Sequence, residues 1–296
     1  MLVPCDLLAM ELTRQLSKRV SILKKNNIFP KLVTVLLGNS AEQLSFVSIK
    51  RRIATKIGID FEFKHIKNEI KFSSFLTDLS NSAQDPKTSG IIVQHPLPTD
   101  FNQQEMYALI PESKEIEGHK KNSTYQFPLS LAVLSALKYI FNKDKDPANS
   151  IVEYQKDKSF FASILQGKKI VIVGKGSTGG APIARTFSDL GANFNVVDSK
   201  TLNPENLFKK ADIIVTAVGE SIIKPNQIGS GVILLNVGLR KENGKLYGDY
   251  DESKISDIAS WYTKTPGGLG PLDVLYLYKN LLDLVELQNN IQVING

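Results

Sequence analysis

The sequence predicts an α/β protein with parallel sheets, folded as two domains. Segments with the pattern of buried strands alternate with segments of helical periodicity, and this alternation is typical of parallel sheets covered by helices. The length of 296 residues is sufficient for two domains of ordinary size. A polar stretch at 142–149, which contains Pro147, is the expected boundary between them.

The first half is expected to alternate between short strands and helices. The strands are predicted at 32–37, 61–66 and 90–94. The helices are predicted at 6–25, 41–57, 73–81, 103–109 and 129–141. Asp6 is the expected N-cap of the first helix, and Gly58 is expected to end the second. Pro96 and Pro98 must end the pairing of the third strand, because proline has no N–H group to donate.

The second half repeats the alternation after a segment at 156–166 that is expected only to connect the domains. Its strands are predicted at 169–173, 193–197, 213–218 and 232–237. Its helices are predicted at 182–190, where Gly191 forms the cap, and at 272–288.

The composition excludes several classes of protein. The net charge is +6, but the basic residues are scattered and are not interleaved with aromatic residues, so we expect no nucleic-acid partner. No apolar run approaches the roughly 18–20 residues of a membrane helix. The three histidines and one cysteine lack the spacing of a metal site, and no internal disulfide is possible. Without the pattern of a secretory signal, the expected compartment is the cytoplasm.

A glycine-rich turn follows the strand at 169–173 and opens a helix. Gly174 lets the chain turn sharply, Gly176 leaves room for a pyrophosphate, and Gly179 or Gly180 allows close packing of helix on sheet. This context is typical of the dinucleotide site of a Rossmann-type domain, where backbone N–H groups and the helix dipole face the phosphates. A turn that serves chain geometry alone is the alternative. The candidate cofactor contacts in the turn are Gly174, Lys175, Gly176, Ser177, Gly179 and Gly180.

The residues after the next strand leave the choice of dinucleotide open. Asp198 stands where an acidic residue commonly binds the adenosine ribose hydroxyls, which favours NAD. Lys175, Ser199 and Lys200 are able to hold a 2′-phosphate, which favours NADP. All four residues are therefore candidate cofactor contacts.

In the first half, a lysine lies on the apolar face of a predicted helix. Lys50 shares the face of Phe46, and burial together with the charges of Arg51 and Arg52 would lower its pKa and suit it to acid–base chemistry. A lysine that only extends its amine from the edge of the apolar face is the alternative. Gln94 leaves a strand at its carboxyl end, where α/β proteins place ligand groups. Spacing alone favours solvated surface charges for Glu115 and Glu117.

Several motifs occur in a fixed order along nearly the whole chain. They are FVSIK at 46–50, VQHPLP at 93–98, KEIEG at 114–118, the glycine-rich turn through Pro182, ADIIVTAVG at 211–219, GDYD at 248–251 and TPGGLGP at 265–271. With these motifs the chain resembles the bifunctional methylenetetrahydrofolate dehydrogenase/methenyltetrahydrofolate cyclohydrolase family.

The resemblance implies a two-domain architecture. A folate-binding catalytic domain at 1–141 would be completed by the C-terminal helix at 272–296. A Rossmann-type NAD(P)-binding domain at 142–271 would lie between them, and two chains would pair as a homodimer. The enzyme would oxidise 5,10-methylenetetrahydrofolate with NADP, or with NAD as the alternative, and then hydrolyse the methenyl product to 10-formyltetrahydrofolate in one-carbon metabolism.

The resemblance also implies roles for individual residues. Lys50 matches the catalytic lysine, Gln94 matches the glutamine that orients it, and Glu117 stands where the family has an aspartate that holds the pterin ring. The implied substrate contacts are Phe46, Pro266, Gly267, Gly268 and Asp273. The implied cofactor contacts extend to Val218 and Gly219.

Departures from the family pattern define the alternatives. Phe46 replaces a tyrosine, so stacking on folate is kept while a hydroxyl that bonds the lysine is lost. Lys175 and Gly176 replace an arginine–serine pair, and Asp273 replaces a threonine. Phe46, together with Glu117 in place of the aspartate, motivates one competing hypothesis, which is a dehydrogenase with little cyclohydrolase activity. The lost tyrosine and loops that differ from the family pattern motivate another, which is a catalytically silent folate- or nucleotide-binding protein.

Overall fold

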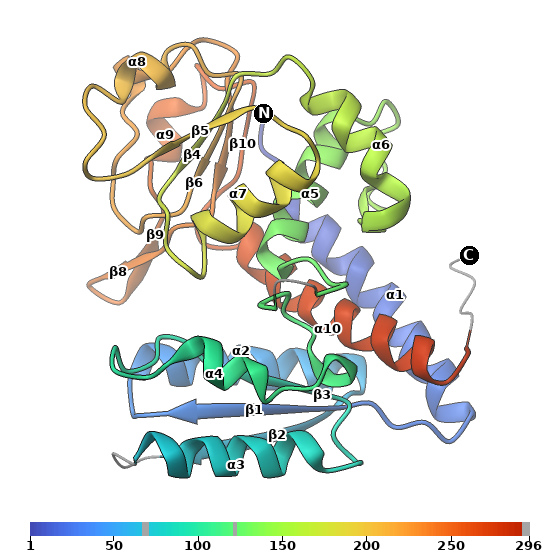
Figure 1. The fold of residues 1–296 in the computed structure, drawn as a ribbon. Helices are drawn as coiled ribbons and strands as arrows, with labels where there is room; N and C mark the ends of the chain where they lie inside the picture. Colours follow the sequence, from blue (N-terminus) through green and yellow to red (C-terminus); the bar gives the residue numbers. More distant parts are fainter. Residues whose placement is uncertain (67–70, 121–122, 292–296) are drawn as a thin grey trace. The chain divides into compact units, whose positions relative to one another are not determined.

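The computed structural model of the chain describes residues 1–66, 71–120 and 123–291 (Figure 1). The residues form two compact units that we describe separately. The three-stranded unit comprises Thr13–Pro128 and Val274–Gly296, and the five-stranded unit comprises Met1–Leu12 and Leu129–Asp273. The α/β class, the parallel sheets and the return of the C-terminal helix to the first-half unit are confirmed.

The three-stranded unit contains a parallel sheet in the order β2-β1-β3. Its strands are β1 (Lys31–Leu37), β2 (Asp60–Ile66) and β3 (Gly90–Val93). Its helices are α2 (Ala41–Ile57), α3 (Phe72–Gln84), α4 (Gln103–Ala108) and the short η1 (Glu112–Lys114), with most of α1 (Cys5–Lys25) and α10 (Leu269–Gln288). Apart from η1, for which no element was expected, these elements match the expected segments to within a few residues. The expected end of the third strand before Pro96 is confirmed.

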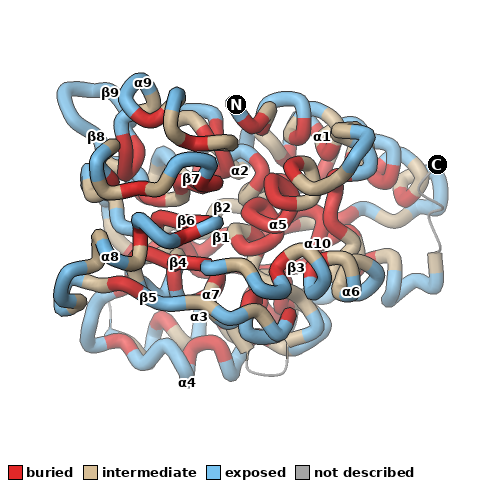
Figure 2. The backbone as a smooth tube through the Cα atoms, turned by 90° about the horizontal axis from the view of Figure 1, so that it is seen from above, coloured by how far each residue is buried: buried red, intermediate tan, exposed pale blue. Residues whose placement is uncertain are grey.

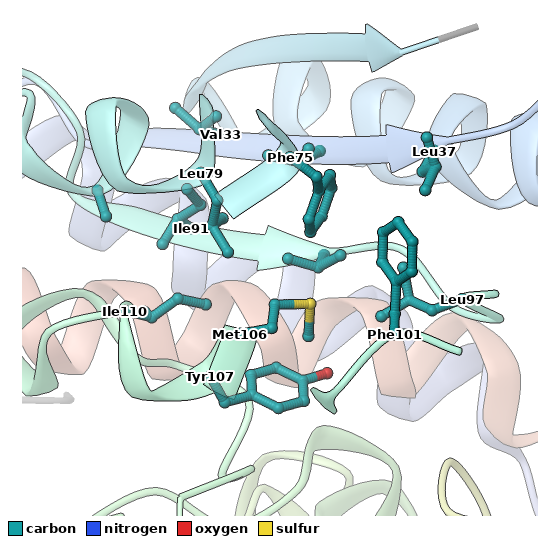
Figure 3. Packing of buried hydrophobic residues seen from close by; sticks show 13 residues of the cluster. Val33, Leu37, Phe75, Leu79, Ile91, Leu97, Phe101, Met106, Tyr107 and Ile110 are labelled. Carbon is teal, nitrogen blue, oxygen red and sulfur yellow. The ribbon is translucent and has the colours of Figure 1, made fainter. Parts of the chain in front are cut away.

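Apolar side chains on one face of this sheet pack against α3 and α4 (Figure 3). Val33 and Ile91 extend from the strands, Phe75 from α3, and Met106 and Tyr107 from α4. The opposite face contacts α10, because a Cβ atom on Gly90 would lie only 2.7 Å from Leu281. Burial along the backbone follows the sheet order: β1 and β3 are almost entirely buried, whereas the edge strand β2 is only partly buried (Figure 2).

The five-stranded unit contains a parallel sheet in the order β10-β7-β6-β4-β5. Its strands are β4 (Ile170–Val173), β5 (Phe194–Val197), β6 (Ile213–Thr216), β7 (Ile233–Asn236) and β10 (Trp261–Tyr262). Because β5 lies on one side of β4 and β6 on the other, the strand order reverses at β4. Open α/β sheets bind ligands outside the carboxyl ends of the strands at such a point.

Several smaller elements complete this unit. They are α5 (Pro128–Phe141), η2 (Ala148–Ser150), α6 (Tyr154–Leu165), α7 (Gly180–Asp189), α8 (Glu205–Phe208), η3 (Pro225–Gln227), the hairpin of β8 (Arg240–Glu242) with β9 (Lys245–Tyr247), and α9 (Glu252–Ile255). The expectation of a plain connecting segment at 156–166 is wrong, because α6 buries Phe161 and Leu165 at helical spacing.

The division of the sequence into compact units differs from the expected boundary at 142–149, because the five-stranded unit already includes the chain from Leu129. Helix α5 belongs to the five-stranded unit, where the amine of Lys138 lies 2.6 Å from the carboxylate of Asp157 and Ser135 donates to the carbonyl of Ser150 at 2.9 Å. These bonds tie α5 to the segment that leads into the second sheet. The functional division at 141/142 stays a prediction.

The helix ends follow the expected signals with one exception. Gly58 ends α2 with a left-handed φ of +86°, and Gly191 follows α7 with a φ of +70°. Asp6 is not an N-cap, because α1 begins at Cys5 and places Asp6 within its first turn. Among the described residues, we find no helix with the length and apolar character needed to span a membrane.

Candidate active site

Lys50 and Gln94 form a hydrogen-bonded pair in the three-stranded unit. Helix α2 carries Lys50, and Gln94 directly follows β3, where its N–H continues the ladder to the carbonyl of Val35. The Lys50 amine donates to Oε1 of Gln94 at 2.7 Å. Nε2 of Gln94 donates to the carbonyl of His95 at 2.9 Å. Because that carbonyl only accepts, the Gln94 amide is held with its oxygen toward the lysine.

Buried side chains tie α2 to α10 and to the segment after β3. The hydroxyl of Tyr278 in α10 donates to the backbone carbonyl of Lys50 at 2.7 Å. Gln43 donates to the carbonyl of Pro96 at 2.7 Å. Both side chains are almost fully buried. The helix thus presents Lys50 and the half-buried Phe46 from a fixed face, as its spacing predicted.

Glu115 organises the loop that follows η1. Its Oε1 accepts the N–H groups of Glu117, Gly118 and His119 at 3.0, 2.7 and 3.1 Å, and Ser123 donates to its second oxygen. The side chain is only 4% exposed, so the prediction of a solvated charge is wrong for Glu115. A buried carboxylate is stabilised by such N–H donors in place of water.

Two further contacts fix the same loop. Gly118 has a φ of +79°, and a Cβ atom there would lie 2.7 Å from the carbonyl oxygen of Tyr125. Asn280 of α10 donates to the carbonyls of Ile116 and Gln126 at 2.8 and 3.0 Å. The roles of Asn280 and Glu115 were not predicted from the sequence. Asn280 is remote in sequence from the loop whose carbonyls it binds, and Glu115 binds N–H groups of an irregular loop that has no sequence period.

Glu117 presents a half-buried carboxylate from this loop. Burial by itself raises the pKa of Glu117, but the neighbouring His119 and the charge of Lys50 outweigh it and leave the pKa below the ordinary value. Nε2 of His119 lies 3.6 Å from Oε2 of Glu117. The carboxylate is therefore negative at neutral pH, and the prediction of a simple solvated charge is wrong for Glu117 as well.

In the five-stranded unit, the glycine-rich turn has two positions that exclude side chains. Gly174 has a φ of +102°, and a Cβ atom there would lie 2.5 Å from the carbonyl oxygen of Ala217. A Cβ atom on Gly180 would lie 1.9 Å from the carbonyl oxygen of Gly174. The sequence did not decide whether Gly179 or Gly180 allows the close packing. The structure assigns this role to Gly180, where the start of α7 approaches the backbone of Gly174. Gly176 faces open space, with nothing within 4 Å of its Cβ position.

The residues that bear on the choice of dinucleotide contact one another. The Lys175 amine lies 2.5 Å from the carboxylate of Asp198. Asp198 also accepts from the N–H of Lys200 at 2.9 Å and from the hydroxyl of Thr201 at 3.2 Å. The hydrogen bond from Lys175, followed by that from Lys200, lowers the pKa of Asp198 to about 2. The side chains of Ser199 and Lys200 are exposed.

A second buried carboxylate shapes the loop after β6. Asp249 accepts the N–H groups of Val218, Gly219 and Glu220 at 3.0, 2.8 and 3.1 Å. Burial raises the pKa of Asp249, while the three N–H donors oppose that effect. A Cβ atom on Gly219 would lie 2.8 Å from the carbonyl oxygen of Leu239. The expected cofactor contacts Val218 and Gly219 thus lie on a loop that Asp249 holds.

The remaining predicted substrate residues belong to the five-stranded unit, whereas Lys50, Gln94 and Glu117 belong to the other. Pro266 and Gly267 are exposed, and Gly268 is buried where a Cβ atom would lie 2.3 Å from the carbonyl oxygen of Lys264. Asp273 lies in the first turns of α10, which begins three residues before its predicted start. In the described ranges, no group of three or more His, Cys, Asp or Glu residues is arranged to hold a metal ion.

Known proteins match both units. The model described as the tetrahydrofolate dehydrogenase/cyclohydrolase catalytic domain matches residues 4–117, and that of the NAD(P)-binding domain of the same family matches residues 150–289. The bifunctional protein FolD of Staphylococcus epidermidis RP62A is 30% identical over 288 residues, which cover 96% of each chain. The FolD protein of Bacillus velezensis is 31% identical over 92% of this chain and 93% of its own length.

A solved structure agrees with these matches. The crystal structure of the bifunctional FolD methylenetetrahydrofolate dehydrogenase/cyclohydrolase from Campylobacter jejuni superimposes with a TM-score of 0.84 at 25% identity. It covers 97% of this chain and 99% of its own. Both halves of the chain, with the motifs that surround Lys50 and Gly174, are thus accounted for by one family. The chain belongs to the tetrahydrofolate dehydrogenase/cyclohydrolase family.

Proposed function

We propose that the chain oxidises 5,10-methylenetetrahydrofolate to the 5,10-methenyl compound with NADP and then hydrolyses that product to 10-formyltetrahydrofolate. The observation that carries the proposal is the Lys50–Gln94 pair, with its 2.7 Å hydrogen bond and the negative Glu117 in the same unit. A family member without chemistry at this site would have no need to hold a lysine and a glutamine in this fixed geometry.

The five-stranded unit supplies a cradle that fits the dinucleotide. Gly174 and Gly180 bring the turn against β6 and α7, and Gly176 leaves its outer side open. The ten-residue helix α7 directs its positive end toward this turn. When bound there, the nicotinamide ring accepts the hydride from the one-carbon bridge of the folate. The residues proposed to hold the cofactor are Gly174, Lys175, Gly176, Ser177, Gly179, Gly180, Asp198, Ser199, Lys200, Val218 and Gly219.

For NADP, Lys175 is the proposed contact of the 2′-phosphate. In the free chain its amine is paired with Asp198, which keeps a positive group beside the site of the ribose. The 2′-phosphate of NADP is attracted by Lys175 but repelled by Asp198, whereas the 2′-hydroxyl of NAD is able to donate a hydrogen bond to Asp198. Because the two residues favour different dinucleotides, we expect any preference between NADP and NAD to be modest rather than absolute.

In the hydrolytic step, we propose that Lys50 moves the proton. Water adds to the methenyl carbon and releases one proton. The remaining hydroxyl proton is transferred to N5 as the bond from that carbon to N5 breaks, which leaves the formyl group on N10 and an N–H group at N5. Lys50 provides a proton-transfer group near the reacting carbon, and Gln94 fixes the direction of its amine. Glu117 binds the donor groups of the pterin ring, and Phe46 stacks on the folate.

Two further proposals follow from family membership. We propose that the protein acts in the cytoplasm and that two copies pair through their dinucleotide-binding domains. Sedimentation equilibrium of the full chain tests the pairing, and a mass of one chain at micromolar concentration would exclude it.

Two assays of the purified chain test the proposed function. The first follows oxidation of 5,10-methylenetetrahydrofolate with NADP and, in parallel, with NAD. The second follows loss of 5,10-methenyltetrahydrofolate in the absence of dinucleotide. We expect both reactions. Oxidation without enzymatic hydrolysis would favour the dehydrogenase that Phe46 suggests, and the absence of both would leave only a binding role.

A further inference from the structure

Three side chains from separate segments form a stacked array beside Glu117. His95 follows β3, Tyr107 lies in α4, and His119 lies in the loop that Glu115 holds. The Tyr107 hydroxyl lies 2.5 Å from Nε2 of His95 and 3.0 Å from Nε2 of His119. The rings of Tyr107 and His119 stack with centroids 4.0 Å apart and planes 19° apart. The chemistry proposed above assigns no role to these three residues.

The Glu117 carboxylate fixes the direction of the hydrogen bonds in this array. A tyrosine hydroxyl has one proton, so it is able to donate to only one of the two imidazole nitrogens. If Tyr107 donated to His119, the lone pair on Nε2 of His119 would face the carboxylate oxygen 3.6 Å away. Repulsion disfavours that arrangement. The stable direction has a proton on Nε2 of His119, which is donated to the Tyr107 hydroxyl at 3.0 Å, while Tyr107 donates to His95. The same N–H group lies 3.6 Å from the Glu117 carboxylate, which is an electrostatic contact rather than a hydrogen bond.

Packing holds the array in place. Tyr107 is buried and belongs to the apolar cluster with Met106 (Figure 3). Phe127 meets the His119 ring edge-on, with centroids 4.7 Å apart. Glu115 accepts the backbone N–H groups of both Glu117 and His119, so the two residues keep their spacing. The His119 ring is therefore constrained by its backbone, by a stacked ring and by an edge contact.

We propose that His119 is a positioning residue for Glu117 and that Tyr107 sets the orientation of its ring. This inference rests on the proposed role of Glu117 in binding the pterin ring. The positive end of the N–H bond at Nε2 of His119 attracts one side of the carboxylate, so that the other side is left to the ligand. His95, as the acceptor at the far end, keeps the Tyr107 proton away from His119. The array thereby makes the glutamate, which has more rotatable bonds than an aspartate, a defined acceptor.

A spectroscopic experiment tests the direction of the array without any turnover. The chain has three histidines, His65, His95 and His119, so their ring-nitrogen signals in the ¹⁵N-labelled full chain can be assigned with single variants. In the neutral rings we expect the proton on Nε2 of His119 and on Nδ1 of His95. In Tyr107→Phe, we expect His95 to favour the tautomer with the proton on Nδ1 less strongly, because its Nε2 atom loses the hydroxyl donor. A proton on Nδ1 of neutral His119 in the wild-type chain would overturn the proposal.

A kinetic comparison tests the positioning role. His119→Phe keeps a ring without a donor, whereas His119→Gln keeps an N–H donor. For 5,10-methenyltetrahydrofolate, we expect His119→Phe to raise KM about fivefold with a smaller change in kcat, because the Glu117 carboxylate loses the N–H dipole that faces it. We expect His119→Gln to recover most of that loss. Equal kinetics for the two variants would overturn the proposal.

A matched control separates this role from a loss of structure. His65→Phe removes another half-buried histidine of the same unit, which bonds the Gly38 carbonyl at 2.8 Å. We expect its KM to stay near the wild-type value, and an equal rise in KM would show a general effect and overturn the proposal. If the wild-type chain hydrolyses no methenyltetrahydrofolate, the proposed function fails. The ring-proton experiment then still decides whether the array has the inferred direction.

Discussion

Replacing Glu115 tests how far one buried carboxylate determines the loop that carries Glu117. In Glu115→Ala, the backbone N–H groups of Glu117, Gly118 and His119 lose their shared acceptor, and the Ser123 hydroxyl loses its own. A single hydrogen bond to a charged group contributes about 1.5–3 kcal/mol, and bonds that share one acceptor do not add fully. The variant leaves neutral buried donors without an acceptor, at about 1–3 kcal/mol each without full additivity, so we expect the free energy of unfolding to fall by about 3 kcal/mol.

The matched variant is Glu115→Gln, which keeps Oε1 as an acceptor and loses the charge. We expect it to cost about 1–2 kcal/mol, because the three N–H bonds persist in weaker form. Urea unfolding followed by circular dichroism gives the free energy, and hydrogen exchange at residues 117–119 gives the local effect. The one tryptophan, Trp261, belongs to the other unit, so its fluorescence alone is an unsuitable probe.

Two results would refute this reasoning. An alanine variant within about 0.5 kcal/mol of the wild type would mean that water replaces the carboxylate at little cost, as at an ordinary surface site. Exchange at residues 117–119 that is unchanged in Glu115→Ala would mean that the loop is held by other contacts, such as those of Asn280 with the carbonyls of Ile116 and Gln126.

Three further predictions concern the reaction and the cofactor. Lys50→Met should reduce methenyl hydrolysis by about 100-fold or more, the usual range for loss of a general acid–base group, and full activity would remove Lys50 from the mechanism. Asp198→Asn should raise the ratio of NADP to NAD efficiency, because it removes the carboxylate that competes for Lys175; an unchanged ratio would contradict this. Gly180→Ala should abolish dinucleotide binding measured by calorimetry, because the new Cβ atom would lie 1.9 Å from the carbonyl oxygen of Gly174 and distort the turn. In Gly176→Ala the new Cβ atom meets no protein atom within 4 Å, so this variant should remain folded.

The elements that the sequence predicted best are those with a clear period. Helix α2 was predicted with its observed bounds, because its apolar face repeats over 17 residues and a glycine ends it. Strand β10 has only two residues, and its place in the sheet depends on pairing with β7. No local pattern marks so short a strand. Helix α6 was missed because its buried face contains only two fully buried residues, Phe161 and Leu165.

The candidate site divides in the same way. Lys50 and Gln94 were singled out from a helix face and a strand end, and the structure brings them within hydrogen-bond distance. Tyr107 was not singled out, because its hydroxyl contacts two histidines that lie on other segments, and the sequence does not show this proximity. Glu115 was predicted as a surface charge, since in sequence it is one of several acidic and basic residues around a glycine. Its burial depends on where the loop folds.

Both units use the same physical device at the place where a regular element ends and a candidate site begins. Glu115 accepts the N–H groups of three consecutive residues, 117–119, and Asp249 accepts those of residues 218–220.

Irregular loops leave backbone donors that a helix or sheet would otherwise satisfy. A neutral amide oxygen binds such donors less strongly than a carboxylate does, and the charge is itself stabilised by the three N–H dipoles. The same interaction thus satisfies the loop, solvates the buried acid and gives the loop one conformation. In the first unit that conformation presents the side chains of Glu117 and His119, whereas in the second it presents the backbone at Val218 and Gly219. This difference matches the two proposed tasks, because recognition of a pterin ring requires a directed carboxylate and close approach of a dinucleotide requires an unobstructed chain.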